Sequence, residues 1–153
     1  MNEVTLRDPK PGDFGWIIHR QAKLYAEEFG LNAEFEGLLA DICGNFIKMF
    51  DPRREWAWVA EIDGQVVGSV FLMRGDELAQ GKLRLLYVEP ATRGSGVGSN
   101  LVTACMDCAR AMGYEKLVLW TESSLSAAAA SSAAVHECLC GDPRRAGKLC
   151  TRR

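Results

Sequence analysis

The chain has 153 residues, a formal net charge of −2 at pH 7, and ordinary proportions of hydrophobic (48%) and charged (25%) residues, which suit one globular domain. The small negative charge argues against nucleic acid as a partner, and no apolar run is long enough to span a membrane. The first residues lack the pattern of a signal peptide, so we expect a cytoplasmic protein with reduced cysteines.

Two amphipathic helices are predicted in the first third of the chain, because apolar residues recur there at helical spacing. Pro11-Gly12-Asp13 marks the start of the first helix, and Gly30 marks its end. Asn32 is suited to cap the second helix, which Asp51-Pro52 terminates. We expect both helices to precede the sheet.

A β-hairpin is predicted next, because residues 56–62 and 66–73 are rich in β-forming residues and flank Asp63-Gly64, a strong turn signal. A third apolar run at residues 82–88 follows closely, which favours the same sheet. A glycine-rich segment then leads into a helix that ends near Gly113.

Residues 117–120 form a further predicted strand, so the chain reads strand, glycine loop, helix, strand. This order is a βαβ unit, which makes its two strands parallel. Together with the hairpin it predicts a mixed sheet and a fold of the α/β (α+β) class.

The glycine-rich loop reads Arg93-x-x-Gly96-x-Gly98. At the start of a helix, backbone N–H groups point outward and the helix dipole favours an anion. The spacing is not the Gly-x-Gly-x-x-Gly of Rossmann folds, and no lysine follows as in a Walker loop. A flexible turn is the simpler interpretation of the three glycines alone, whereas an anion site requires the surrounding strand and helix.

With Leu85-x-x-Val88-x-Pro90 before it and Leu101 after it, this loop resembles the acetyl-CoA motif of the GNAT superfamily of N-acetyltransferases. Residues 11–28 are similar to acetyltransferase modules that follow MarR-type regulators in some bacteria. The resemblance implies a mixed, mostly antiparallel central sheet with flanking helices and a V-shaped splay between the fourth and fifth strands. It implies a core over residues 1–122, followed by an atypical segment at 123–153.

The resemblance also implies acetyl-CoA as cosubstrate, no metal, and an amine substrate that accepts the acetyl group. For the general base, Glu89 borders the cofactor strand, while Tyr25 and Glu28 lie on the first helix, which in relatives forms part of the acceptor-site wall; none of the three stands out. The residues expected to bind acetyl-CoA lie in the cofactor strand and the loop: Leu86, Tyr87, Val88, Arg93, Gly94, Ser95, Gly96, Val97, Gly98, Ser99 and Asn100.

Residues 123–153 depart from the family pattern, because a low-complexity Ala/Ser tract is followed by a mixture without periodicity. Relatives carry a tyrosine after the fifth strand that protonates the coenzyme A thiolate, and this chain has none after Tyr114. A shifted reading frame near Ala128 would produce such a change. We therefore expect impaired acetyl transfer, a disordered or altered end, and association through an unpaired edge strand, which leaves a homodimer open.

Two alternatives to an active enzyme remain. The chain could be a non-catalytic acyl-CoA-binding protein, which would need the loop but no acid or base. It could instead be a zinc-binding interaction domain, built from Cys105 and Cys108 with His136, Cys138 and Cys140. Cys105 and Cys108 lie on the apolar stripe of their predicted helix, where buried free cysteine is common, so we favour no metal.

Overall fold

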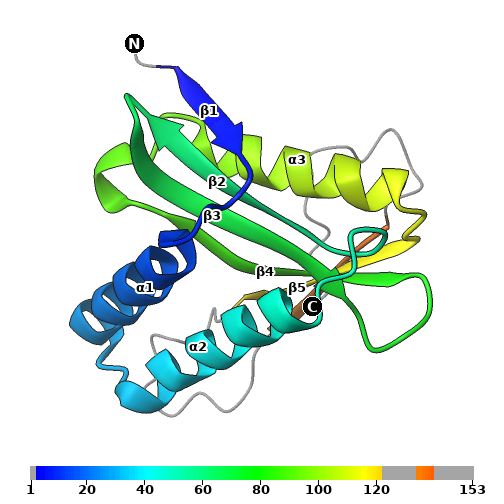
Figure 1. Cartoon of the computed structure of the whole chain (residues 1–153), viewed down its shortest axis with the longest axis horizontal. Helices are drawn as coiled ribbons and strands as arrows, with labels where there is room; N and C mark the ends of the chain where they lie inside the picture. The colour runs from blue at the N-terminus through cyan, green and yellow to red at the C-terminus, as the bar shows by residue number, and fades with distance from the viewer. Residues whose placement is uncertain (1–2, 122–133, 140–153) are drawn as a thin grey trace. The chain divides into compact units, whose positions relative to one another are not determined.

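A computed structural model describes residues 3–121 and 134–139 of the chain (Figure 1). The described residues fall into two compact units. The larger contains residues 3–9, 51–120 and 135–139, and the smaller is built around residues 10–50. Within the described part, no helix has both the length and the apolarity needed to cross a membrane.

The smaller unit holds the two predicted helices, α1 (Asp13–Phe29) and α2 (Ala33–Lys48). Gly30 ends α1 in the left-handed region, with a φ of 70°, and its N–H donates to a carbonyl of the last turn. Asn32 caps α2, because its side chain accepts a hydrogen bond from the Glu34 N–H at 3.0 Å. Both helix boundaries inferred from the sequence are therefore confirmed.

The larger unit is a six-stranded sheet with the spatial order β1-β2-β3-β4-β5-β6, and helix α3 (Val97–Ala111) lies along it (Figure 1). The pairs β1–β2, β2–β3 and β3–β4 are antiparallel, and β4–β5 is parallel. The mixed, mostly antiparallel sheet expected from the sequence is confirmed. The strands are β1 (Val4–Arg7), β2 (Trp56–Ile62), β3 (Gln65–Arg74), β4 (Gln80–Val88), β5 (Lys116–Thr121) and β6 (Ala134–Leu139).

The expectation that both helices precede the sheet is wrong. Strand β1 comes before α1 and pairs with β2, from Val4 opposite Ile62 to Arg7 opposite Val59. Four residues are too few for the alternation of side chains to indicate a strand, so this element exists because the edge of β2 offers it hydrogen bonds.

The far side of the sheet also differs from expectation. Strand β6 lies beside β5, in a stretch where the sequence pattern predicted no strand, so β5 is not the outer strand of this sheet. Residues 122–133 and 140–153 lie outside the described part of the chain. The predicted low-complexity end and the reading-frame hypothesis fall largely on those residues.

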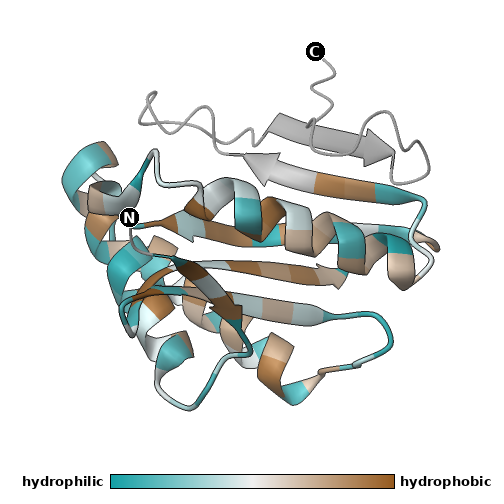
Figure 2. Cartoon of the chain, turned by 90° about the horizontal axis from the view of Figure 1, so that it is seen from above, coloured by the Kyte–Doolittle hydropathy of each residue, from teal (hydrophilic) through white to brown (hydrophobic). Residues whose placement is uncertain are grey.

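The core of the larger unit lies between α3 and one face of the sheet. Figure 2 shows hydrophobic and polar segments alternating along α3, as expected of a helix with one buried face. Cys105 is fully buried in this core, which confirms its place on the apolar stripe. The buried cluster comprises Ala60, Val67, Val70, Leu72, Leu83, Val97, Leu101, Cys105, Met106, Ala109 and Leu117.

Candidate functional site

Strands β4 and β5 pair over only part of their length. Their register runs from Gln80 opposite Lys116 to Leu83 opposite Leu119. Beyond Leu83, β4 continues to Val88, and its described pairing there is with β3. The predicted splay between the fourth and fifth strands is therefore present. A ligand on the β5 side of this part of β4 could therefore hydrogen-bond to the strand, as β5 does up to Leu83.

A β-bulge in β4 lies at the start of this splay. Arg84 stands opposite Phe71 and Tyr87 opposite Ser69, so two residues of β4, Leu85 and Leu86, face a single residue of β3. Leu85 has a φ of 51°, in the left-handed region that non-glycine residues rarely adopt. Such a bulge bends the strand and increases its twist, which carries the end of β4 away from β5.

The side chain of Ser69 holds this bulge in place. Ser69 is buried, and its hydroxyl donates a hydrogen bond of 3.0 Å to the carbonyl oxygen of Leu85. A hydrogen bond of this kind contributes about 0.5–1.5 kcal/mol to stability, and here it ties β3 to the bulge of β4. Nothing in the local sequence pattern marks Ser69, because its role depends on the strand register.

The glycine loop follows β4 through a short 3₁₀ turn, η1 (Pro90–Thr92). Gly94 and Gly96 have φ values of 86° and 83°, which a side chain would strain, and both lie in open space. The Ser95 N–H donates to the Thr92 carbonyl at 3.1 Å, which fixes the turn before the helix. The backbone conformation therefore favours glycine at these two positions.

Helix α3 begins without a cap. Its N-cap residue is Gly96, which makes no side-chain hydrogen bond, and its first turn carries no acidic residue. By contrast, α1 has Asp13 in its first turn and α2 has the Asn32 cap. The first helical hydrogen bond of α3 is donated by the Asn100 N–H to the Gly96 carbonyl at 3.0 Å. The amides before it face an exposed loop, which suits an anion such as pyrophosphate.

Val97 anchors this loop to the core, since its side chain is 1% exposed and belongs to the cluster beneath α3. A Cβ built on Gly98 would lie 3.6 Å from Val88 Cγ2, so the loop and the splayed end of β4 are neighbours. The structure thus brings together the two predicted groups of cofactor residues: Leu86, Tyr87 and Val88 on β4, and Arg93, Gly94, Ser95, Gly96, Val97, Gly98, Ser99 and Asn100 on the loop and α3.

The three predicted base candidates do not share one unit. Glu89 is half-buried directly after β4, where its N–H donates to the Val67 carbonyl at 2.7 Å. Glu28 is exposed on α1 in the smaller unit. Tyr25, also on α1, packs its ring against Phe29 in a tilted arrangement and edge-on against Phe35, with centroids 5.6 and 5.2 Å away. Glu89 is therefore the candidate that lies in the same unit as the loop.

The last tyrosine of the sequence, Tyr114, lies at the end of α3 opposite the loop. Its hydroxyl donates a hydrogen bond of 2.7 Å to the Arg54 carbonyl oxygen. The pKa of this hydroxyl is raised, mainly by burial. It lines a cavity of about 540 Å³ with Arg54 and Arg74, among others, at the start of β4. This position separates Tyr114 and the cavity from the glycine loop by the length of α3.

No group of three or more His, Cys, Asp or Glu side chains in the described residues is arranged to hold a metal ion. Burial raises the pKa of the Cys108 thiol, which disfavours the thiolate that zinc requires. The side chains of His136, Cys138 and Cys140, the other half of the zinc alternative, lie outside the described residues.

Comparisons with known proteins agree with this geometry. The model of the acetyltransferase (GNAT) family matches residues 19–133. The chain is 30% identical over 133 residues to the uncharacterized N-acetyltransferase YjgM of Escherichia coli (strain K12), covering 85% of this chain and 76% of that protein. The match to the family model spans both the β4 strand and the glycine loop.

Solved structures show the same fold at low identity. A GNAT family acetyltransferase from Brucella melitensis, in complex with acetyl-CoA, has a TM-score of 0.67 at 19% identity over 99% of this chain and 97% of that one. A GNAT family acetyltransferase from Staphylococcus aureus Mu50 has a TM-score of 0.66 at 18% identity, over 82% and 78%. This chain belongs to the GNAT family of acetyltransferases, which use acetyl-CoA.

Proposed function

We propose that this chain transfers the acetyl group of acetyl-CoA to a primary amine of a small molecule or a protein. One observation carries the proposal: the splayed end of β4 lies beside the uncapped start of α3. An extended thioester arm needs free strand backbone, and a pyrophosphate needs free amides at a helix start. Here the splayed strand and the helix start are adjacent. The strand offers hydrogen-bonding backbone groups, and the helix start is the positive end of the helix dipole.

The roles of the residues follow from their positions. Arg93 and the amides of residues 94–99 would hold the pyrophosphate, with Asn100 nearby. The backbone of Leu86, Tyr87 and Val88 would hydrogen-bond the pantetheine arm. Arg93 is exposed beside the loop, where it can reach a phosphate oxygen as a charged donor.

The reaction joins the amine nitrogen to the acetyl carbon and breaks the bond from that carbon to sulfur. A backbone N–H of β4 within the splay would donate to the acetyl oxygen as it gains negative charge. We assign the removal of the amine proton to Glu89, acting through a chain of water molecules along the splay, because it follows the cofactor strand directly, whereas Glu28 and Tyr25 belong to the smaller unit.

We further propose that turnover is slow. The leaving thiolate needs a proton, and the tyrosine that supplies it in relatives has no counterpart after Tyr114 in this sequence. Tyr114 itself is held by Arg54 at the far end of α3. The same observation favours a second candidate function, a binding protein for acyl-CoA that does not turn it over.

Gly96→Glu tests the cofactor site, measured as acetyl-CoA affinity by isothermal titration calorimetry. The added carboxylate about 4 Å from a phosphate would oppose binding by about 4 kcal/mol, so we expect a loss of at least about 100-fold. Gly113→Glu is the matched control, because Gly113 has the same left-handed backbone (φ 86°) and open space. It lies about 22 Å away along the 15 residues of α3.

Equal affinity of the Gly96→Glu and Gly113→Glu proteins would contradict the assignment of the loop to pyrophosphate. Release of coenzyme A thiol with a panel of amines then separates the two candidate functions. Binding without turnover supports the binding protein, and rapid turnover contradicts the proposed impairment.

A further inference from the structure

Two basic side chains of β4, Lys82 and Arg84, lie where this strand leaves β5. Leu83 is the last residue of β4 in register with β5, and Arg84 is the next residue along the strand. Arg84 also immediately precedes the bulge at Leu85. It is therefore the first residue of the splay, and no role in cofactor binding has been assigned to it.

These two side chains share the face of the sheet that α3 does not cover. Leu83 belongs to the core cluster beneath α3, so the alternation of side chains along a strand places Lys82 and Arg84 on the other face. Their partners across β3 are Met73 and Phe71, both apolar. On β3, Arg84 thus stands opposite an apolar residue rather than a carboxylate.

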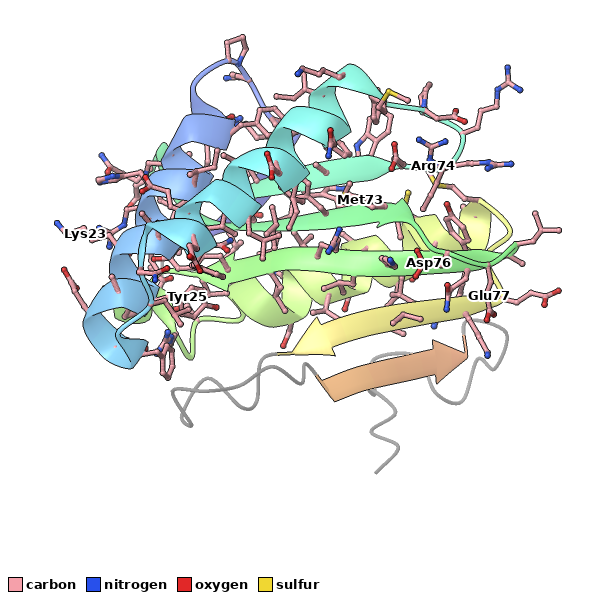
Figure 3. The ribbon with its side chains drawn as sticks, turned by 90° about the horizontal axis from the view of Figure 1, so that it is seen from below. Lys23, Tyr25, Met73, Arg74, Asp76 and Glu77 are labelled. Atoms are coloured by element: carbon pink, nitrogen blue, oxygen red, sulfur yellow. The ribbon has the colours of Figure 1, made fainter. Side chains whose placement is uncertain are left out.

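The charges of Lys82 and Arg84 are compensated only in part. Asp76, in the loop between β3 and β4 (Figure 3), bonds the Lys82 Nζ at 2.9 Å. The Lys82 side chain is 14% exposed, whereas that of Asp76 is 81% exposed. Among the described residues the Arg84 guanidinium has no hydrogen-bond or ion-pair partner. Lys82 and Arg84 therefore share one nearby carboxylate, that of Asp76, which leaves about one positive charge of this pair uncompensated.

The partly buried position of the Arg84 guanidinium is energetically unfavourable. Arg84 is half-buried, and burial lowers its pKa, an effect that the charge of Asp76 opposes only in part. A half-buried cation without a partner is unfavourable unless a bound group completes its hydrogen bonds. An anionic ligand at this point of the splay would remove that cost.

We propose that Arg84 binds a carboxylate of the acceptor, so that the substrates are small amino acids rather than simple amines or polyamines. This inference rests on the proposed acetyl transfer. The acyl arm would enter the splay from the end that lies beside the start of α3. It could extend only as far as Leu83, where β4 and β5 are paired, so the acetyl group would lie near Arg84. The planar guanidinium binds a carboxylate with two parallel hydrogen bonds, and one uncompensated charge matches one carboxylate.

The test measures binding, so it does not depend on the rate of turnover. The protein is saturated with coenzyme A and titrated by calorimetry with N-acetyl amino acids and with the matching N-acetyl amino acid amides, which lack the carboxylate. We expect the unaltered protein to bind the best acid about 10- to 150-fold more tightly than its amide, the range for hydrogen bonds to a charged group.

Arg84→Met should remove this preference, with the acid falling to the affinity of the amide, and Arg84→Lys should retain part of it. Arg53→Met is the matched control, because it makes the same change of charge at an exposed position and should leave the preference intact. Asp76→Asn should tighten binding of the acid severalfold, since it removes the opposing carboxylate, an effect that a merely structural role would not produce.

Equal binding of acids and amides, or an Arg84→Met protein that behaves like Arg53→Met, would overturn the inference. A preference for phosphorylated amines over amino acids would overturn it as well. If coenzyme A fails to bind the unaltered protein, the proposed function and this inference both fall. If coenzyme A binds and the carboxylate preference is absent, only this inference falls.

Discussion

Replacing Gly68 with alanine tests how α3 and β4 are held together. Gly68 lies on β3 opposite Val88. A Cβ at this position would lie 2.7 Å from the carbonyl oxygen of Tyr87, 3.0 Å from Val97 Cγ1 and 3.1 Å from Leu101 Cδ1. The nearest of these is backbone, which cannot rotate away, and the other two belong to fully buried side chains.

Overpacking of this kind lowers the free energy of unfolding by about 1–3 kcal/mol. Alanine also reduces the conformational entropy of the unfolded chain, which offsets about 0.4–1 kcal/mol of that loss. Because the closest clash is with backbone, we expect a net loss of about 1–2 kcal/mol in the free energy of unfolding. The Tyr87 carbonyl on β4 and the Val97 side chain both have to shift to make room for the added methyl group. Affinity for acetyl-CoA should therefore fall together with stability.

Urea denaturation followed by circular dichroism measures the first effect, and calorimetric titration measures the second. Gly37→Ala is the matched control, since Gly37 lies within α2 and a Cβ added there would meet nothing within 4 Å. There the same substitution should stabilise by about 0.5–1 kcal/mol. A Gly68→Ala protein as stable as the unaltered chain would refute the close approach of α3 to β3.

Three further changes follow from the site. Ser69→Ala should cost about 1 kcal/mol in the free energy of unfolding and weaken acetyl-CoA binding, because the Leu85 carbonyl loses its donor; unchanged values in both would contradict this. Glu89→Gln should lower kcat about 100-fold with acetyl-CoA affinity unchanged, and a full rate would remove Glu89 as the base. Burial raises the pKa of Cys43 from 9.0 to about 11, so mass spectrometry after iodoacetamide treatment at pH 8 should find it unmodified in the native protein. The folded state keeps this proton between those two values and the unfolded state loses it, so stability should fall as pH rises from 9 to 11.

The sequence predicted those elements whose ends are set by local chemistry. Asp63 and Gly64 both have positive φ, 53° and 76°, as a two-residue hairpin turn requires, and β2 has the predicted bounds Trp56–Ile62. Gly30 and Asn32 likewise mark real helix ends. In each case one or two residues determine the backbone without help from distant parts of the chain.

The features that shape the site depend on distant partners and could not be predicted in this way. The bulge at Leu85 is invisible in the pattern, because Leu85 and Leu86 are both apolar and fit any register. Its support comes from Ser69, sixteen residues earlier in the sequence. The charge around Arg84 likewise depends on Asp76, which approaches only because β3 turns back into β4.

The anchoring of the loop by Val97 links cofactor concentration to the tolerance of the core for mutation. A ligand that binds only the folded state stabilises it by about 2.7 kcal/mol when present at 100 times its Kd. Val97 packs in the same cluster as Leu101 and Met106, so substitutions there would loosen the start of α3 without touching the ligand. Cells rich in acetyl-CoA would then retain core variants that are lost when the metabolite is scarce.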